Sequence, residues 1–423
     1  MTYVTVRFTH PTHNTVRFTH PTNDQPENPF MKYKLLGRSG LRVSELCLGC
    51  ATFGTNWGTI GSDKRESGRI FDAFVEAGGN FIDTSNRYQE GQSEEFLGTF
   101  IQSDRDRLVL ATKFSLFDGF SDGKDPNGCG NHRKNLFRSV EGSLKRLKTD
   151  YIDLLWAHIY DYTTPIDEML RALSDLVSQG KVHYIGASNF PAWWLARANT
   201  MADLQGFTPF VATQLEYSIV ERSCEPEFLP LAHEMDIGLV CWSALAGGMA
   251  TGKYNRAGGG GELRRLVDEV DPARRHFWHA MTERNLGIME EVVRIADEIG
   301  RPACQLWLRW LMQQKVVNIP IFSARTVEQA KEDLACVDFT LSDEHMAALT
   351  RASMPAVASI MPGAGAYPYP MLEYGSPALP EFYSRGLLFG AIEDKIVNHR
   401  RVYPYQYQRP AAATASAPQP VGV

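Results

Sequence analysis

The chain has 423 residues, of which 43% are hydrophobic, and it carries a formal net charge of −6 with a sequence pI near 6.0. A chain of this length can bury a substantial core, either as one large barrel or as two ordinary domains. Its lysines and arginines are scattered and form no basic stripe, which argues against a nucleic-acid partner. The sequence shows neither a membrane-spanning apolar run nor an apolar signal core, so we expect a soluble, cytoplasmic protein.

The N-terminal segment, residues 1–30, differs in character from the rest of the chain. It contains an imperfect tandem copy of TVRFTHPT, at Thr5–Thr12 and again at Thr15–Thr22, and then a polar stretch. A repeat this short cannot build a solenoid. We therefore expect a disordered extension over residues 1–30, a single barrel over 31–352, and an irregular C-terminal tail over 353–423 whose low-complexity end is disordered.

From Met31 onward the sequence predicts a β-hairpin around the turn Arg38-Ser39-Gly40, and then a regular alternation of strands and helices. Eight apolar runs read as strands, at Glu45–Leu48, Asn80–Thr84, Leu108–Lys113, Tyr151–His158, Val182–Ser188, Val211–Glu216, Gly238–Ser243 and Val316–Phe322. Helical patterns lie between and after them, at Asp63–Ala77, Ser93–Phe100, Asn135–Leu147, Ile166–Ser178, Pro191–Met201, Glu227–Met235 and Thr326–Ala335. Two extra helices, near Thr282–Ile299 and Pro302–Met312, precede the eighth strand.

This alternation predicts an α/β fold in which eight parallel strands close a (β/α)₈ TIM barrel, with an N-terminal β-hairpin and extra helices. Runs such as YIDLLWAH are apolar almost throughout, as expected of parallel strands that are covered on both sides. The rival fold is an open, doubly wound sheet. That fold would favour a G-x-G-x-x-G loop after its first strand, and the segment from Gly49 to Gly54 lacks this spacing.

Seven cysteines stand at irregular spacing, an odd number that suits a reducing compartment better than a disulfide framework. Cys47 and Cys50 form a C-x-x-C pair, but Cys47 lies in an apolar strand and no second pair or histidine is present at zinc spacing. We therefore predict no metal site.

Polar residues gather where the early strands end: Asp83 after the second strand, Tyr88 in the following loop, Lys113 closing the third and His158 closing the fourth. Taken singly, each has an ordinary alternative. Asp83 can cap a turn, Tyr88 can be a loop aromatic, and Lys113 can be a solvated strand end. His158 can be a satisfied core histidine. Barrel enzymes build their sites on the carboxyl rim, however, so we expect these four to converge there as catalytic residues.

This set of side chains suits the reduction of a carbonyl group. Hydride attack places negative charge on oxygen, and an acid must deliver a proton to it. Tyr88 is a reluctant donor at its ordinary pKa, and an adjacent Lys113 ammonium would bring that pKa nearer the working range. Asp83 would hold Lys113 charged and in place, while the imidazole of His158 would orient the substrate oxygen.

The segments DTSNRYQEGQSEEFLG, VLATK and DLLWAH resemble the signature segments of the aldo-keto reductase superfamily, whose pattern runs in order over about residues 32 to 350. GNHRKN, YDYTTPIDEMLRAL and GKVHYIGASNFPAWWLARANT are more narrowly similar to the group of aryl-alcohol dehydrogenases and norsolorinic-acid reductase-type enzymes. The resemblance implies that Tyr88 is the general acid in reduction, with Asp83, Lys113 and His158 completing the catalytic tetrad.

The resemblance also implies an extended NADP(H) across the barrel rim. It assigns cofactor contacts to Thr52, Ser188, Asn189, Gln214, Trp242, Ser243, Leu245, Gly248, Lys253, Ser323, Arg325, Gln329, Glu332 and Asp333. Arg325 beside a helix N-terminus suits a 2′-phosphate and favours NADP over NAD. The sequence departs from the family pattern at Ala244, Ser323 and Asp333, and Asp333 adds negative charge there. The alternatives are that Trp242 packs the barrel mouth, that Gln329 and Glu332 form a solvated helix face, and that Ser188-Asn189 is a capped turn.

Two other classes of function compete with a carbonyl reductase. One is a cofactor-sensing regulatory barrel that resembles channel β subunits, against which the intact tetrad argues. The other is a metal-assisted hydrolase, which would need ligands at strand ends that Lys113 and Trp242 occupy instead. The expected partner is a small-molecule carbonyl substrate. Trp57, Trp193, Trp194 and Phe117, in or near rim loops, suggest an aromatic one, although they can equally be packing residues.

Overall fold

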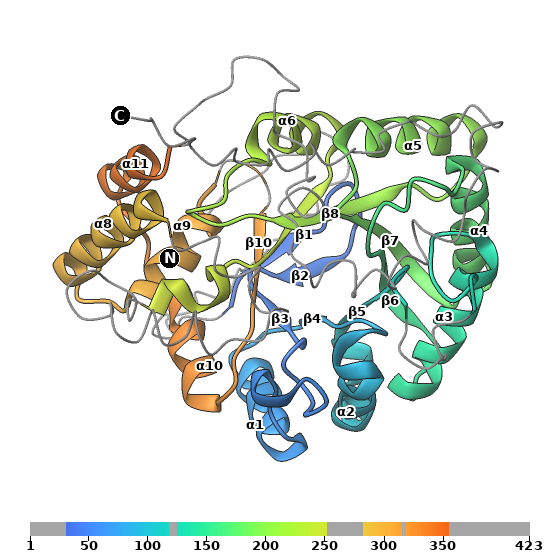
Figure 1. Cartoon of the computed structure of the whole chain (residues 1–423), viewed down its shortest axis with the longest axis horizontal. Helices are drawn as coiled ribbons and strands as arrows, with labels where there is room; N and C mark the ends of the chain where they lie inside the picture. Colours follow the sequence, from blue (N-terminus) through green and yellow to red (C-terminus); the bar gives the residue numbers. More distant parts are fainter. Residues whose placement is uncertain (1–30, 118–124, 252–281, 315, 317, 355–423) are drawn as a thin grey trace, which may run out of the picture.

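The computed structural model describes residues 31–117, 125–251, 282–314, 316 and 318–354. Eight parallel strands form a closed barrel in the order β10-β3-β4-β5-β6-β7-β8-β9, and helices surround it (Figure 1). The predicted (β/α)₈ barrel is therefore confirmed. The barrel strands are β3 (Cys47–Gly49), β4 (Phe81–Asp83), β5 (Val109–Phe114), β6 (Ile152–Ala157), β7 (Val182–Ser188), β8 (Phe210–Glu216), β9 (Gly238–Trp242) and β10 (Asn318–Phe322).

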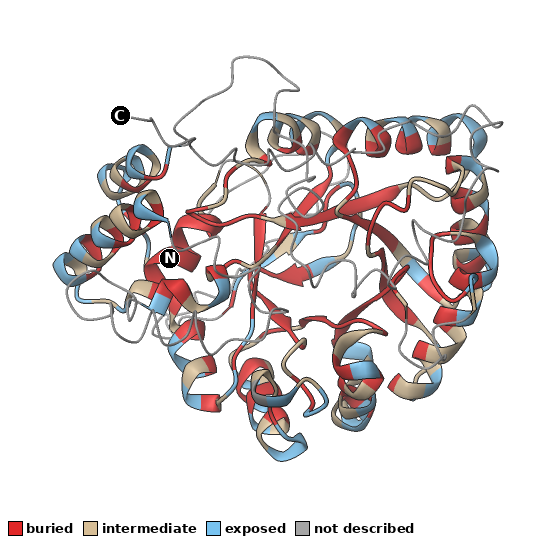
Figure 2. Ribbon diagram, viewed as in Figure 1, coloured by how far each residue is buried: buried red, intermediate tan, exposed pale blue. Residues whose placement is uncertain are grey.

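The helices stand outside the ring and turn their apolar faces toward it. They are α1 (Lys64–Glu76), α2 (Gln92–Phe100), α3 (Arg133–Leu147), α4 (Ile166–Ser178), α5 (Ala192–Gln205), α6 (Glu225–Met235), α8 (Glu283–Ile299), α9 (Ala303–Met312), α10 (Val327–Leu334) and α11 (Asp343–Ala352). Figure 2 shows the barrel strands buried almost throughout, apart from the start of β7, and most helices buried on their inner faces and exposed on their outer ones, while α9 is almost wholly buried. This pattern is expected of amphipathic helices that cover a barrel.

Short hydrogen-bonding side chains define several helix starts. The side chain of Asp63 accepts from the backbone N–H of Glu66 at the start of α1. In the same way, the hydroxyl of Thr282 accepts from the third helical residue of α8, and that of Thr326 accepts from the third helical residue of α10. These N-caps satisfy backbone donors that the first helical turn leaves without a partner. The helix boundaries therefore match signals that the sequence already carries.

The N-terminal hairpin closes the amino-terminal end of the barrel. Its strands β1 (Tyr33–Leu35) and β2 (Arg42–Ser44) pair antiparallel, and they lie at the centre of the ring in Figure 1. Leu36 and Val43 are buried in the same cluster as the inward-facing barrel residues. Gly37 has a φ of +54°, and a Cβ added there would lie 2.2 Å from the carbonyl oxygen of Val211, at the start of β8. The hairpin leaves the opposite, carboxyl end of the barrel for a site.

The predicted disordered extension over residues 1–30 lies outside the described residues, and so does the predicted irregular tail over 353–423, apart from Ser353 and Met354 at its start.

Candidate active site

The four predicted catalytic residues come together at the carboxyl ends of neighbouring strands. Asp83 ends β4, Lys113 is the penultimate residue of β5, and His158 directly follows β6. Tyr88 opens the short helix η2 (Tyr88–Gly91) that comes after β4. The barrel register therefore brings residues from three strands and one loop to the same rim.

Asp83 and Lys113 form a buried ion pair. The Nζ of Lys113 donates to Oδ1 of Asp83 and, at 2.8 Å, to the carbonyl oxygen of Thr84. The Nε2 of Gln214 donates to the other Asp83 oxygen at 2.9 Å. Burial works to lower the pKa of Lys113, but Asp83 and Tyr88 outweigh it, so that the pKa of Lys113 is raised. Lys113 is thus held as a charged ammonium in a buried position.

Tyr88 lies against this ammonium. The Nζ of Lys113 is 4.7 Å from the centroid of the Tyr88 ring. Burial raises the pKa of Tyr88, and this effect exceeds the opposing charge and hydrogen bond of Lys113, so that the net shift is upward. Lys113 acts in the predicted direction, but our expectation that the pKa as a whole is lowered is wrong for the protein alone. Tyr88 is therefore a neutral hydroxyl, the form that can give up a proton.

His158 completes the group from the side of β6. Its ring is nearly perpendicular to that of Tyr88, at 83° and with centroids 6.0 Å apart. Burial and the nearby charge of Lys113 hold the pKa of His158 well below its usual value, so that the imidazole is neutral near pH 7. Its Nδ1 is 3.4 Å from the hydroxyl oxygen of Ser85. When the Ser85 hydroxyl donates to Nδ1, the ring proton is on Nε2, where it can point toward a ligand.

A second group of residues, which the resemblance assigned to cofactor binding, lies beside the tetrad at the ends of β7, β8 and β9. Ser188 pairs in register with Gln214. The Nδ2 of Asn189 donates to the carbonyl oxygen of His158 and to the Ser188 hydroxyl, both at 3.1 Å. Its Oδ1 accepts from the indole N–H of Trp242 at 3.0 Å. These bonds fix Trp242 at the mouth of the barrel next to His158.

The chain after β9 turns sharply at the rim. Ser243 has a φ of +56°, and Gly248 has a φ of +97° within the short helix η5 (Ala246–Thr251). The backbone N–H of Gly248 donates to the carbonyl oxygen of Leu245 at 3.0 Å. Lys253 lies outside the described residues.

The loops after β3 and β10 meet at the same rim. The hydroxyl of Thr52 donates to the carbonyl oxygen of Ala324 at 2.9 Å, and that of Ser323 donates to the carbonyl oxygen of Gly49 at 2.9 Å. Arg325 is exposed and immediately precedes Thr326, the N-cap of α10. The structure thus brings Thr52, Ser323 and Arg325 together, although they come from opposite ends of the barrel sequence.

The residues of α10 that were predicted to contact the cofactor do not all lie on its exposed face. The Oε1 of Gln329 accepts from the backbone N–H of Arg325 at 2.9 Å, and Glu332 is exposed. Asp333 is buried instead, and it accepts a hydrogen bond from the thiol of Cys304 on α9. Burial raises the pKa of the Asp333 carboxyl to about 7. Asp333 therefore packs α10 against α9 and does not add charge to the rim surface.

Comparison with known proteins agrees with this geometry. A profile described as the aldo/keto reductase family matches residues 45–353. The chain belongs to the aldo/keto reductase family. It is 36% identical over 330 residues to a norsolorinic acid reductase of Aspergillus flavus, covering 76% of this chain and 81% of that protein. It is also 36% identical over 320 residues to an aryl-alcohol dehydrogenase [NADP(+)] of Phanerodontia chrysosporium, covering 73% and 82%. Over 323 residues it is 36% identical to an uncharacterized oxidoreductase of Bacillus subtilis, covering 74% and 93%.

These similarities establish this aldo/keto reductase as an oxidoreductase related to aryl-alcohol dehydrogenases. Of the aromatic residues singled out in the sequence, Trp57 contacts the tetrad, because its ring is edge-on to that of Tyr88 with centroids 6.1 Å apart. Trp194 is a core residue between Phe190 and Phe210. Trp193 is 39% exposed and contacts Tyr160.

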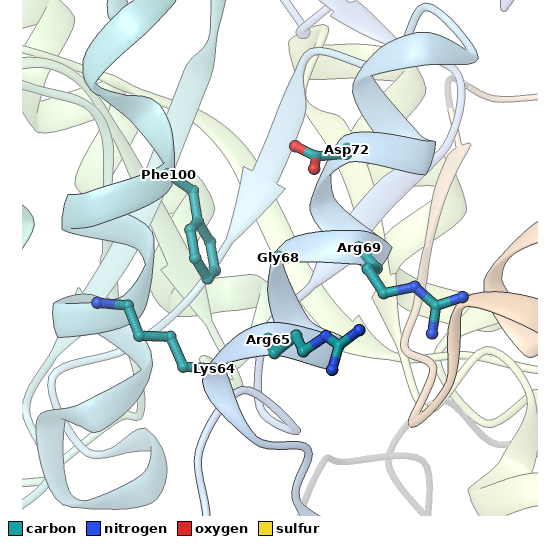
Figure 3. Close-up of a pocket in the computed structure, with 6 residues that line it drawn as sticks. All are labelled: Lys64, Arg65, Gly68, Arg69, Asp72 and Phe100. Carbon is teal, nitrogen blue, oxygen red and sulfur yellow. The ribbon is translucent and has the colours of Figure 1, made fainter.

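A hollow of about 530 Å³ lies on the outer surface of the reductase, between α1 and α2 (Figure 3). Its lining residues are Lys64, Arg65, Gly68, Arg69, Asp72 and Phe100. Arg69 is already paired with Glu66 at 2.7 Å and with Glu328 at 3.4 Å. The hollow contains none of the rim residues, so its position does not suit the barrel chemistry.

Within the described ranges, no cluster of histidine, cysteine and acidic side chains could hold a metal ion, and all seven cysteines are buried and outside any disulfide. No helix among the described residues is both long and apolar enough to cross a membrane.

Sequence reasoning missed Ser85, which the structure places beside Nδ1 of His158. Its position two residues after Asp83, in the same loop as Tyr88, was the available signal.

Proposed function

We propose that this aldo/keto reductase reduces an aryl aldehyde or ketone to the alcohol with NADPH, and that Tyr88 is the proton donor. The observation that carries the proposal is the buried Asp83–Lys113 pair lying against Tyr88, with the His158 ring nearly perpendicular to that of Tyr88. Reduction of a carbonyl needs an acid and a hydrogen-bond donor directed at one oxygen atom. Tyr88 and His158 supply these two functions from different elements.

In this mechanism the hydroxyl of Tyr88 donates its proton to the substrate oxygen as negative charge develops there. The Lys113 ammonium stabilises the phenolate that forms, and Asp83 keeps that ammonium in place. The neutral His158 donates a hydrogen bond from Nε2 to the same oxygen and fixes the angle of the carbonyl group. Bound NADPH would supply the hydride.

The residues at the rim fit a nicotinamide cofactor. Gln214 uses its Nε2 on Asp83, which leaves its Oε1 to accept a hydrogen bond from a carboxamide. The indole N–H of Trp242 is fixed by Asn189, so that the ring is held in one orientation suited to stacking. Ser188, Ser243, Leu245 and Gly248 flank the same position, and Lys253 would add a cation for the pyrophosphate.

The adenosine end would lie over the loops that carry Thr52, Ser323 and Arg325. The guanidinium of Arg325 is exposed beside the N-terminus of α10, where the helix dipole favours an anion. An arginine at this position suits a 2′-phosphate, which favours NADP over NAD. Gln329 and Glu332 extend this surface. We leave Asp333 out of the proposed cofactor site because it is buried against α9.

The aryl preference is supported by Trp57, whose ring stands edge-on to Tyr88 and can form one wall beside the reacting oxygen. The name of the Phanerodontia chrysosporium relative, an aryl-alcohol dehydrogenase [NADP(+)], points to the same substrate class and cofactor.

The proposal is tested by assaying the purified protein with a carbonyl panel that includes 4-nitrobenzaldehyde, with NADPH and NADH in parallel. We expect absorbance-detected oxidation of NADPH that depends on the aldehyde. Arg325→Ala should weaken NADPH binding by about tenfold or more, because it removes a charged hydrogen bond, and should change NADH binding little.

Lys331→Ala is the matched control, since it removes another exposed cation from α10. An equal effect of Arg325→Ala on both cofactors would contradict the 2′-phosphate assignment. Tight NADPH binding without turnover on any member of the panel would contradict the enzymatic proposal and favour a regulatory barrel.

A further inference from the structure

We propose that Ser115, Asn131 and Asp161 form a buried hydrogen-bonded chain, here called the His158 support, that positions His158 for the substrate. The inference rests on the proposed function, in which His158 orients the carbonyl group. None of the three residues belongs to the tetrad or to the cofactor contacts. They come from three separate segments of the chain: the end of β5, the segment before α3 and the loop after β6.

Ser115 is the member that touches His158. Its Oγ accepts from the backbone N–H of His158 at 3.0 Å and donates to Oδ1 of Asn131 at 2.5 Å. Ser115 is fully buried and has a φ of +97°, a backbone conformation that residues other than glycine rarely adopt. Such strain persists only where the surrounding structure imposes it, and it concentrates at functional sites. A glycine would suit the backbone better here, but it would lack the hydroxyl.

Asn131 connects two segments through its amide. Its Oδ1 receives the Ser115 hydroxyl, and its Nδ2 donates to the carbonyl oxygen of Ile159 at 2.8 Å. The position needs an acceptor facing Ser115 and a donor facing Ile159, and a side-chain amide provides both. Gly130 precedes it with a φ of +96°, and its backbone N–H donates to the carbonyl oxygen of Ser115 at 2.7 Å. The segment before α3 is thereby locked onto the end of β5.

Asp161 anchors the other end. One carboxylate oxygen accepts from the backbone N–H of Asn131 at 2.7 Å and from the Thr164 hydroxyl at 2.6 Å. The other accepts from the backbone N–H groups of Thr163 and Thr164 at 3.2 and 3.0 Å. All four bonds need an acceptor, so an ionised carboxylate satisfies them and an amide cannot. Asp161 is almost fully buried and fixes the turn that comes after His158.

The position of His158 gives this chain its role. His158 lies just beyond the last residue of β6, and its backbone N–H is shared between the carbonyl oxygen of Phe114 in β5, at 3.1 Å, and the Ser115 hydroxyl. The His158 support accepts the backbone N–H of His158 and donates to the carbonyl oxygen of Ile159. Asn189 donates to the carbonyl oxygen of His158 at 3.1 Å. A shift of about 1 Å in a substrate-orienting group can cost about 100-fold in rate. Ser115, Asn131 and Asp161 are therefore positioning residues for the imidazole.

Ser115→Gly tests the proposal, because it removes the hydroxyl at a backbone conformation that glycine accepts. We expect kcat/KM for 4-nitrobenzaldehyde to fall about tenfold or more, while the NADPH dissociation constant and the melting temperature stay near those of the wild type. In a His158→Gln background the same change should cost less than about twofold, because the group being positioned is already absent. Ser139→Ala, which removes another buried hydroxyl near Asn135, is the control and should leave kcat/KM unchanged.

A second readout does not need activity. The imidazole NMR signals of His158, assigned by their loss in His158→Gln, should shift in Ser115→Gly and in Asn131→Asp and stay in place in Ser139→Ala. Unchanged His158 signals in the first two variants would overturn the positioning role, as would an equal loss of kcat/KM in both backgrounds. An inactive wild type would instead contradict the proposed function, and the NMR result would still decide the positioning role.

Discussion

At the scale of single residues, burial sets the chemistry of the titratable groups at the rim. It raises the pKa of Tyr88 and lowers that of His158, so that both are neutral donors, while Asp83 keeps Lys113 charged. The sequence shows which polar and charged residues stand at the ends of strands. It does not show how much water remains around them, and this is why the tetrad could be predicted but the net shift of Tyr88 could not.

Asp333 allows the effect of burial on the pKa of a single carboxyl group to be tested. Its folded-state pKa of about 7 lies above the value of about 3.9 for an unfolded aspartate. The folded protein therefore holds this proton more tightly. The resulting contribution to the free energy of unfolding is complete below about pH 4 and is lost as the pH rises to about 7.

We therefore predict that Asp333→Asn becomes more stable relative to the wild type as the pH is raised from 5 to 8, by at least about 1 kcal/mol. Asparagine keeps an oxygen that can accept from Cys304. Urea unfolding at both pH values measures the difference. Asp338→Asn, which changes an exposed carboxylate, serves as the control. A constant difference between wild type and Asp333→Asn at the two pH values would refute the assignment.

At the scale of elements, close backbone approaches determine which helix positions tolerate a side chain. Gly98 in α2 faces α3 so closely that an added Cβ would lie 2.2 Å from the carbonyl oxygen of Arg146. At Gly287 in α8, a Cβ would have no atom of another described segment within 4 Å. Both glycines lie inside helices, so alanine gains the same helix propensity at each. The difference between the two substitutions therefore measures the effect of packing.

We predict opposite signs for these two substitutions. Gly98→Ala should lower the free energy of unfolding by about 1–3 kcal/mol through the clash between α2 and α3. Gly287→Ala should raise it by about 0.5–1 kcal/mol, because alanine loses less backbone entropy in a helix. Thermal or urea unfolding of the two variants measures both effects. A Gly98→Ala variant at least as stable as the wild type would show that the packing of α2 against α3 is not as described, and a destabilised Gly287→Ala variant would contradict the open space at that position.

Most elements could be predicted from the sequence because their signals are local. The predicted bounds of β7 and α4 coincide with the observed ones, and the capping residues Asp63 and Thr326 mark true helix starts. The helix α11 was missed, although Ser342 caps it and acidic residues occupy its first turn. The positive φ of Ser115 depends on contacts with distant segments, so no local pattern could reveal it.

At the scale of the whole molecule, closure of the barrel makes the site possible. Residues as distant as Thr52 and Ala324 meet because β3 pairs with β10. The alternation of eight strands with helices predicted this closure, and the hairpin at the amino-terminal end leaves chemistry to the opposite rim. The sequence did not reveal which of the residues proposed to contact the cofactor reach the surface, as Asp333 illustrates, because that depends on how α10 packs against α9.

The central claim, that Tyr88 delivers the proton from beside Lys113, is tested most directly by Tyr88→Phe. NADPH-dependent reduction of 4-nitrobenzaldehyde and NADPH binding by fluorescence are to be measured on the same preparation. Phenylalanine keeps the ring next to Lys113 and removes only the hydroxyl, so we predict that turnover falls by at least about 100-fold while the NADPH dissociation constant changes less than about threefold. Turnover by Tyr88→Phe at the wild-type rate would contradict the account.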